Sequence, residues 1–286
     1  MLMNTRGLFA NNNQTKTLWL ADLAKQKNSF LMCLTETHLN ESISNNELVN
    51  SHWDIIRADR EIRQCGGTAI LYRSDIIIDH GNILKVSNSY CEMICCFFPS
   101  INLANITIYR PPGCPTIKFQ DTLNQAEDWI TKLEKAAHKP TILLNGDLNL
   151  PFMENWNQAV TDSLLEAIEC RKTKGKSISS DKEQALLLYN LVSEHFMIQS
   201  VNDPTRYKNI LDLQFCNDQN TIFDYEILDT VITSDHAAII FSTNIALDKS
   251  KCPDKPKSKI YSTKIHEFDT LTATKLEWDK VRHSIA

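Results

Sequence analysis

The stretch TILLNGDLN at residues 141–149 is the feature that most restricts what this 286-residue chain can fold into. Residues 141–144 are an uncharged run of β-branched and leucine residues, which is typical of a strand buried on both faces. Asn145-Gly146 has the composition of a turn and predicts that the strand ends there. Asp147 and Asn149 follow two positions apart, so in an extended backbone their side chains point the same way.

A carboxylate and a carboxamide that project together from a buried strand can hold a water molecule and a phosphate oxygen. The alternative interpretation is an Asx turn that only closes a loop. For GDLN alone the structural interpretation is favoured, because so short a pattern is common. A functional interpretation therefore depends on what the other segments of the chain supply.

The composition restricts the class of protein more than its activity. Nine cysteines are an odd count, and several of them lie in apolar strand-like runs, which favours free buried thiols over a disulfide framework. No apolar run is long enough for a membrane span and no signal peptide is recognisable, so we expect an intracellular protein without a membrane partner. The formal net charge of −5 neither indicates nor excludes nucleic-acid binding.

The order of the predicted elements indicates an α/β fold. Strands are predicted at 30–34, 53–58, 68–72, 76–78, 90–98, 103–109, 210–216, 225–233 and 237–243, and helices at 17–25, 122–137 and 181–195. Neighbouring strands that demand antiparallel pairing, mixed with helices, predict a two-sheet β-sandwich flanked by helices.

The character of the chain changes near residue 246. Residues 249–259 form a basic, proline-containing linker, and residues 260–286 show only weak helical segments. We therefore predict one globular domain at 1–245 and a linker with a partly helical tail at 246–286.

Polar side chains recur at the predicted ends of buried strands. They are Asn4, Glu36, Tyr109, Asp147 with Asn149, Asp212, and the pair Asp235-His236. One such carboxylate would be a cap or a turn, but several exceed what structure alone requires, because buried charges are costly unless paired or metal-bound. Glu36 and Asp235 suit a hard divalent cation such as Mg²⁺. Asp212 is the candidate that would fix the tautomer of His236.

The same residues lie in an ordered series of short motifs. The series is Asn4, LTETHL at 34–39, YRPP at 109–112, GDLN at 146–149, LDL at 211–213 and SDH at 234–236. In this order it resembles the endonuclease/exonuclease/phosphatase family, and the resemblance covers residues 1–245. It implies the deoxyribonuclease-like four-layer fold.

Further motifs narrow the resemblance within that family. ETHL, RADR at 57–60 followed by a glycine pair, and PTR at 204–206 most resemble the endonuclease domain of LINE-type non-LTR retrotransposon polyproteins. In those polyproteins the nuclease precedes a reverse transcriptase, which would account for the tail after residue 246.

The resemblance implies a catalytic set. Asp147 would orient or deprotonate the attacking water, while Asn149 and Tyr109 would bind the scissile phosphate. His236, backed by Asp212, would stabilise the charge that develops on the phosphorus oxygens.

The resemblance also implies a metal set and a DNA-binding set. Glu36 would hold Mg²⁺, or alternatively Mn²⁺, with Asn4 in its network and Asp235 nearby. The predicted DNA contacts are Arg110, Thr205, Arg206 and Asn209.

The function implied is a Mg²⁺-dependent endonuclease that nicks duplex DNA and leaves a 3′-hydroxyl for target-primed reverse transcription. Its partners would be double-stranded DNA and, through the parent polyprotein, the element RNA, in the nucleus. The alternatives are an abasic-site repair nuclease, a phosphatase of small phosphate esters, and an inactive transposon remnant. The opening segment has only three residues before Asn4, so we expect the first sheet to lack part of an edge, the main threat to activity.

Overall fold

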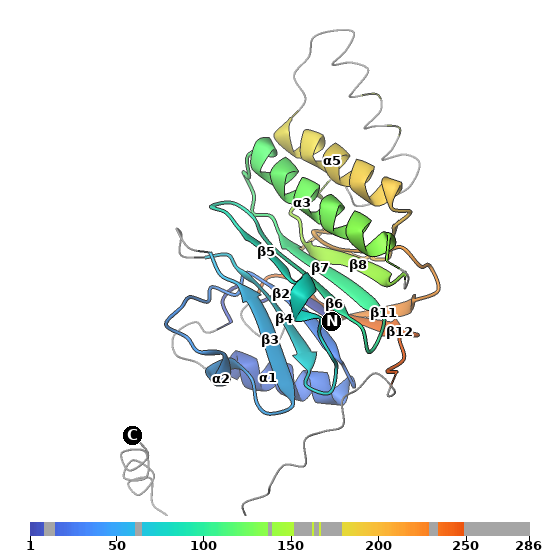
Figure 1. Ribbon diagram of the computed structural model, residues 1–286. Coiled ribbons are helices and arrows are strands. Elements are labelled where there is room, and N and C mark those ends of the chain that lie inside the picture. The colour runs from blue at the N-terminus through green and yellow to red at the C-terminus, as the bar shows by residue number, and fades with distance from the viewer. Residues whose placement is uncertain are drawn as a thin grey trace, which may run out of the picture. The chain divides into compact units, whose positions relative to one another are not determined.

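Two stacked β-sheets with helices on both outer faces make up the fold of the chain (Figure 1). The computed structural model describes residues 1–8, 15–60, 65–136, 139–151, 162, 166, 179–228 and 234–248. Met1–Cys252 form one compact unit. The predicted linker and tail fall outside the described residues from 249 onward.

The first sheet has six strands in the order β11-β12-β1-β2-β4-β3. Their bounds are β1 Leu2–Asn4, β2 Leu31–Thr35, β3 Trp53–Ala58, β4 Thr68–Arg73, β11 Ile222–Leu228 and β12 Ala238–Thr243. Only β1 and β2 run parallel among these neighbours. Helix α1 (Thr15–Gln26) packs on its outer face through Leu20 and Ala24, and the short α2 (Asn45–Leu48) adds Leu48.

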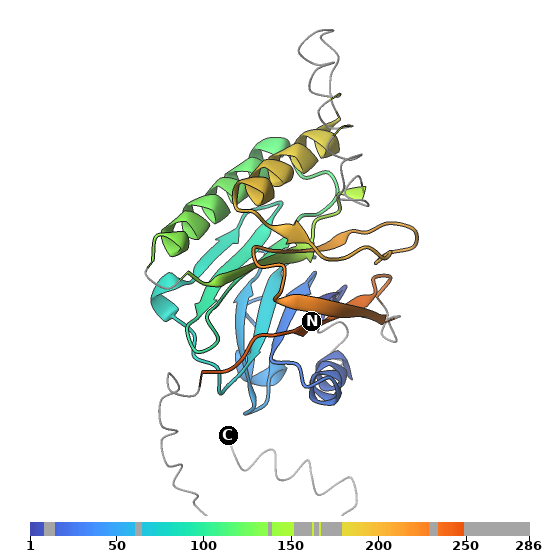
Figure 2. The same cartoon turned by 90° about the vertical axis from the view of Figure 1, so that its right-hand side faces the viewer.

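The second sheet has six strands in the order β5-β6-β7-β8-β10-β9. Their bounds are β5 Leu84–Ser87, β6 Glu92–Phe98, β7 Leu103–Tyr109, β8 Thr141–Asp147, β9 Ile198–Gln199 and β10 Asp212–Cys216. Helices α3 (Thr116–Glu134) and α5 (Ser180–Glu194) lie side by side on its outer face, as Figure 2 shows, and the 3₁₀ turn η2 (His80–Asn82) precedes β5. The predicted two-sheet α/β architecture is confirmed.

Strand β8 does not end at Asn145-Gly146, so the turn predicted there is wrong. Asn145 is accommodated inside the sheet because its side chain bonds to β7: its Nδ2 donates to Asn105 Oδ1 at 2.8 Å, and Thr107 Oγ1 donates to its Oδ1 at 3.2 Å. A Cβ at Gly146 would lie 1.8 Å from the carbonyl oxygen of Ile108, so only glycine fits. The strand therefore carries Asp147 to the end of the sheet.

Two further predictions, an incomplete edge of the first sheet and a hairpin strand at 76–78, are also wrong. Strand β1 is an interior strand between β12 and β2, so the short opening segment does not leave an open edge. Residues 76–78 form no strand, because β4 already has β2 on one side and β3 on the other. The strand that follows them in the chain is β5, which pairs with β6 in the other sheet.

The expectation of free thiols is confirmed for the cysteines that the structure describes. All seven are unpaired, and only Cys65 is exposed. Among the described residues, no helix has both the length and the apolar character needed to cross a membrane.

Candidate active site

The ends of strands from both sheets meet at one place in the sandwich. Strand β1 packs against β8 and β10 across the interface between the sheets. Asn4 and Asp147 end β1 and β8, Asp212 begins β10, and His236 lies two residues before β12. All four side chains are at most 2 % exposed. The fold therefore assembles a buried polar cluster from three strands and the segment before β12, which are far apart in the sequence.

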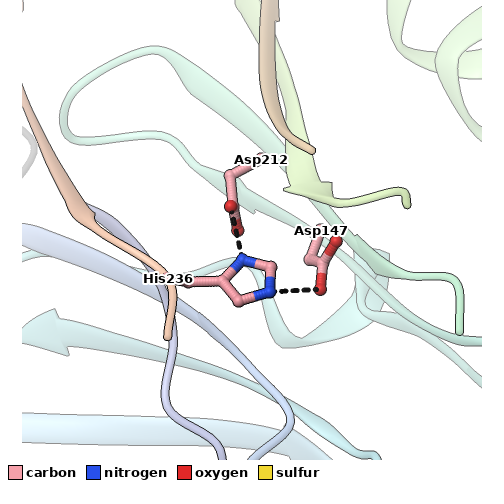
Figure 3. Close-up of side chains that lie close together, drawn as sticks. All are labelled: Asp147, Asp212 and His236. Carbon is pink, nitrogen blue, oxygen red and sulfur yellow. Dashed lines mark hydrogen bonds and ion pairs between the residues drawn. The ribbon is translucent and has the colours of Figure 1, made fainter. Parts of the chain in front are cut away.

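His236 lies between two carboxylates (Figure 3). Asp147 and Asp212 are directly opposite one another on the antiparallel strands β8 and β10. The Nδ1 atom of His236 is 2.7 Å from Asp212 Oδ2, and its Nε2 atom is 3.9 Å from Asp147 Oδ2. The predicted pairing of Asp212 with His236 is thus present in the geometry.

The environment of this cluster shifts the pKa values of Asp147 and His236. Burial, together with the neighbouring charge of Asp212, raises the pKa of Asp147 to about 8. Burial alone would lower the pKa of His236, but the hydrogen bond to Asp212 and the charges of both carboxylates raise it to about 9. The arrangement therefore favours the protonated form of His236. It also brings the pKa of Asp147 close to neutral pH, where the carboxyl group can take up and release a proton.

Both oxygens of Asp147 are fixed by neighbouring amides. Asn4 Nδ2 donates to Asp147 Oδ2 at 2.8 Å, and the backbone N–H of Asn149 donates to Asp147 Oδ1 at 3.1 Å. Asn149 has a left-handed backbone, with φ of 48°. The prediction that the side chains of Asp147 and Asn149 point the same way assumed an extended backbone, and it is therefore wrong. The side chain of Asn149 instead donates to the carbonyl of Arg110 at 3.1 Å.

Glu36 and Tyr109 connect the two sheets beside this cluster. The Tyr109 hydroxyl, at the end of β7, donates to Glu36 Oε1 at 2.7 Å just beyond β2. Burial and the charge of Glu36 raise the pKa of Tyr109, so its phenol stays neutral and can donate. The Glu36 side chain is 22 % exposed, and His38 Nε2 is 3.8 Å from its Oε2 atom. His38 is a neighbour of the site that the sequence did not indicate.

Asp235 lies next to His236 but belongs to a separate ion-pair network. Arg206 donates from Nε and Nη2 to Asp235 Oδ2 at 2.9 and 2.6 Å, and Arg6 Nη1 is 3.3 Å from Oδ1. Burial would raise the pKa of Asp235, but the hydrogen bonds and charges of these arginines lower it. The carboxylate is therefore ionised and already neutralised by protein groups.

Arg110 cannot make the DNA contact that was predicted for it, because its side chain has no exposed surface. Its Nη1 atom donates to the carbonyls of Leu148 and Asn149 at 3.1 and 3.0 Å. Its remaining donors bond to Gln184 and Asp181 of α5. Arg110 thus ties the loop after β8 to α5 and supports Asn149 from inside the protein.

Thr205 is likewise internal, which corrects its predicted contact with DNA. It is 2 % exposed, and its hydroxyl accepts from the backbone N–H groups of Leu211 and Asp212 at 3.0 and 3.1 Å. The hydroxyl therefore fixes the backbone at the beginning of β10, where Asp212 stands.

Arg206 and Asn209 stay at the rim of the site. They form an antiparallel bridge that closes a tight turn. Arg206 is half-buried and Asn209 is partly covered within the same turn. Tyr207 lies in this turn, is 80 % exposed, and has the Arg206 guanidinium 5.8 Å from its ring centroid. This exposed aromatic side chain is a second neighbour of the site that the sequence did not indicate.

The donor atoms of the site suit a divalent cation at Glu36 better than at the buried cluster. Asp147, Asp212 and His236 do place one ligand atom each within 4.8 Å of one another. A metal ligand must be a deprotonated imidazole, however, and both nitrogens of His236 face carboxylates that favour its protonated form. The partly exposed carboxylate of Glu36 is a hard oxygen ligand of the kind that Mg²⁺ prefers.

The other two predicted metal ligands are already engaged in hydrogen bonds or ion pairs. Asn4 Oδ1 accepts from the backbone N–H of Arg6 at 2.9 Å. Asp235 is neutralised by Arg206 and Arg6. Glu36 also accepts a hydrogen bond, from Tyr109, but this partner is neutral and the Oε2 atom of Glu36 lies in a partly exposed side chain, so Glu36 is the residue of the predicted metal set that best fits the cation.

Residues 103–240 match the family described as Endonuclease-reverse transcriptase. No curated protein matches the chain.

Three solved structures illustrate the similarity of fold. The endonuclease domain of TRAS1, a telomere-specific non-LTR retrotransposon, is similar with a TM-score of 0.53 at 13 % identity, over 87 % of this chain and 97 % of that one. An AP endonuclease from Archaeoglobus fulgidus gives 0.58 at 11 % identity, over 85 % and 98 %. A variant of the 3′ phosphatase NExo from Neisseria, bound to a product DNA hairpin, gives 0.58 at 12 % identity, over 85 % and 98 %.

The sequence match and the fold agree with the motif series. The four-layer arrangement of helices and sheets is the one that these nucleases share. The chain accordingly resembles the endonuclease/exonuclease/phosphatase family and, within it, the LINE-type retrotransposon endonucleases.

Proposed function

We propose that this chain is a metal-dependent endonuclease that hydrolyses one phosphodiester bond in a strand of duplex DNA. The observation that carries the proposal is the buried cluster in which Asn4 and Asn149 fix Asp147 beside the His236–Asp212 pair. DNA as the substrate is supported by the similar structures, which include endonucleases and a phosphatase bound to a DNA hairpin.

The cluster accounts for the proton and charge movements of hydrolysis. Asp147 would take a proton from the attacking water while the water oxygen bonds to phosphorus. The raised pKa of Asp147 suits this role of general base. The protonated Nε2 atom of His236, held by Asp212, would donate to a phosphoryl oxygen as negative charge builds there. Cleavage of the P–O3′ bond, the polarity that the resemblance implies, leaves a 5′-phosphate and a 3′-oxygen, which takes a proton from solvent water to become the 3′-hydroxyl.

Tyr109 and Asn149 would bind the scissile phosphate. The neutral phenol of Tyr109 donates to Glu36, so its hydroxyl connects the end of β7 in one sheet to the residue after β2 in the other. Mg²⁺, with Mn²⁺ as the alternative, would be held mainly by Glu36 and would supply positive charge to neutralise the phosphate. Asn4 and Asp235 would lie near the cation, and Asp235 would hold Arg206 and Arg6 in place beside it.

We further propose that the nick primes reverse transcription within a retrotransposon protein. The support is the matched family description, which joins an endonuclease to a reverse transcriptase, and the similarity to the TRAS1 domain. On this proposal residues 1–245 are the nuclease domain, residues 246–286 lead toward a reverse transcriptase, and the protein works on nuclear DNA with the element RNA.

An abasic-site nuclease is the second candidate. The observation in its favour is that an AP endonuclease from Archaeoglobus fulgidus has a similar fold, with a TM-score of 0.58. The two candidates differ in substrate, since an abasic-site nuclease cuts a duplex with one abasic site far faster than an intact duplex.

Nicking of supercoiled plasmid by the purified chain tests the proposal. We expect open circles with Mg²⁺, none with EDTA, and almost none for Asp147→Asn, while Asp121→Asn on the exposed face of α3 retains full activity. Cleavage of only the abasic duplex would favour the second candidate. A folded wild-type chain that cuts neither substrate would contradict both and indicate an inactive remnant.

A further inference from the structure

A buried ion pair that the proposed mechanism does not use lies directly behind Tyr109. Arg60 Nε is 2.5 Å from Glu92 Oε1, and Arg60 Nη2 is 2.8 Å from Glu92 Oε2, so the pair is bidentate. Glu92 has no exposed surface and the side chain of Arg60 is 8 % exposed. Because removing two charges from water offsets most of their attraction, such a pair is weak evidence for a stabilising role.

The contacts of the pair converge on Tyr109. Glu92 on β6 is the direct cross-strand partner of Tyr109 on β7. The guanidinium carbon of Arg60 lies 5.5 Å from the centroid of the Tyr109 ring, within the range of a cation–π contact. The ring that carries the hydroxyl bonded to Glu36 is therefore held from behind by a planar charged group.

The same pair is packed against the glycine pair Gly66-Gly67. A Cβ on Gly66 would lie 2.4 Å from the guanidinium carbon of Arg60, so the backbone must approach that closely. The backbone N–H of Gly67 donates to Glu92 Oε2 at 3.0 Å. The ion pair thus fixes the glycine pair, which directly precedes β4.

From the glycine pair the contacts continue to the loop that carries Glu36. The N–H groups of Thr37 and His38 donate to the carbonyls of Gly67 and Gly66 at 3.2 and 2.8 Å. Glu36 has a left-handed backbone, with φ of 47°, which a non-glycine residue keeps only when its surroundings hold it. Two chains of contacts therefore connect the ion pair to Glu36, one through the Tyr109 ring and hydroxyl and one through the glycine pair and this loop.

We propose that Arg60 and Glu92 form a positioning clamp that sets the Tyr109 hydroxyl and the Glu36 carboxylate for phosphate and metal binding. This inference rests on the proposed function, because it assigns the clamp to that same reaction. Neither residue touches the reacting atoms; both act through Tyr109 and the loop around Glu36. The requirement for planar, bidentate geometry also explains why arginine rather than lysine stands at position 60.

The first test compares Arg60→Lys with wild type, using a duplex oligonucleotide and steady-state kinetics. Lysine keeps the charge but loses the planar fork, so we expect kcat to fall about 30-fold with KM changed less than about threefold. In the double variant Arg60→Lys with Tyr109→Phe, the two losses should combine to less than their product, because part of the Arg60 effect passes through the Tyr109 hydroxyl. If the two losses multiply instead, Arg60 does not act through the Tyr109 hydroxyl.

The second test separates positioning from stability. The paired replacement Arg60→Met with Glu92→Gln removes both charges, keeps an acceptor for the Gly67 N–H, and is expected to keep the urea midpoint close to that of wild type. We expect its kcat to stay as low as that of Arg60→Lys. Recovery of full activity in this stable variant would overturn the clamp.

A third readout needs neither DNA nor metal. Amide hydrogen exchange at Gly67 and His38 should be about tenfold faster in Arg60→Lys than in wild type, while exchange in β8 is unchanged. Unchanged protection at both amides would overturn the clamp even in an active enzyme. Failure of wild type to cut any DNA would contradict the proposed function instead, and the exchange result would still decide whether the ion pair holds the loop.

Discussion

The two halves of the candidate site differ in how they treat charge. The closed half, which we define as Asn4, Asp147, Asp212 and His236, is at most 2 % exposed, and its polar groups bond mainly to one another. The open half, which we define as Glu36, Asp235 and Arg206, has side chains that are 22 %, 17 % and 32 % exposed. One half is isolated from water, and the other faces it.

The difference indicates a division of labour. Low exposure strengthens electrostatic interactions and shifts pKa values, which is what proton transfer requires. Partial exposure leaves room for a hydrated cation and a phosphate backbone, which must enter and leave. Substitutions in the closed half should therefore lower the rate of the chemical step, whereas substitutions in the open half should mainly change metal and DNA binding.

Removing the histidine of the closed half should give the largest loss. We expect His236→Gln to lower kcat about 1,000-fold, because the group that stabilises developing charge is lost while the shape of the side chain is partly kept. The measurement is single-turnover cleavage of a duplex oligonucleotide. His80→Gln, at an exposed position in η2, is the matched control and should be fully active. A loss of less than about fivefold would place His236 outside the chemistry.

Substitution of the two arginines predicted to bind DNA, Arg110 and Arg206, should change the unfolding free energy by very different amounts. Arg110→Met leaves two backbone carbonyls and Gln184 without their donor inside the protein. We expect it to cost about 3 kcal/mol of unfolding free energy, measured by urea denaturation. A cost below about 1 kcal/mol would show that Arg110 is not the internal tie described above.

The His236–Asp212 pair should make stability depend on pH. The folded pKa of His236 is raised from its ordinary value of 6.5 to about 9, so its contribution is fully present below 6.5 and is lost as pH rises through about 9. We expect the urea midpoint of wild type to fall over this range and that of Asp212→Asn to fall less. Parallel curves for the two proteins would contradict the pairing.

The smallest effect is expected from the arginine of the open half. Arg206→Met should change unfolding free energy by less than about 1 kcal/mol, because its ion pair with Asp235 is partly exposed. It should raise KM for duplex DNA about threefold and reduce the salt dependence of binding. An unchanged KM and salt dependence would exclude Arg206 from the DNA contact.

Local patterns predicted much of the fold. The strands at 53–58 and 103–109 were predicted to the residue, because both contain β-branched residues and both end at charged or turn residues. The helix predicted at 122–137 begins earlier, at Thr116, directly after Pro115, since a proline just before a helix marks a beginning rather than a break. The continuation of β8 through Asn145-Gly146 was missed, because the hydrogen bonds of the Asn145 side chain to β7 cannot be read from the local sequence.

The site was less predictable than the fold for a related reason. The motifs indicated which strand ends carry polar groups, and the fold brings Asn4, Asp147, Asp212 and His236 together. They did not indicate whether an arginine faces solvent, which depends on distant elements such as α5 for Arg110. The Arg60–Glu92 pair joins residues 32 positions apart, so neither member is informative alone.

The most direct test of the division between the two halves is the dependence of cleavage rate on Mg²⁺ concentration for Glu36→Gln and Asp147→Asn. We predict that Glu36→Gln needs at least about tenfold more Mg²⁺ for half-maximal rate and recovers much of its activity when saturated. Asp147→Asn should keep the wild-type Mg²⁺ requirement and remain about 1,000-fold slower at every concentration. The opposite pattern, with the Mg²⁺ requirement shifted by Asp147→Asn and not by Glu36→Gln, would place the cation in the buried cluster and contradict this account.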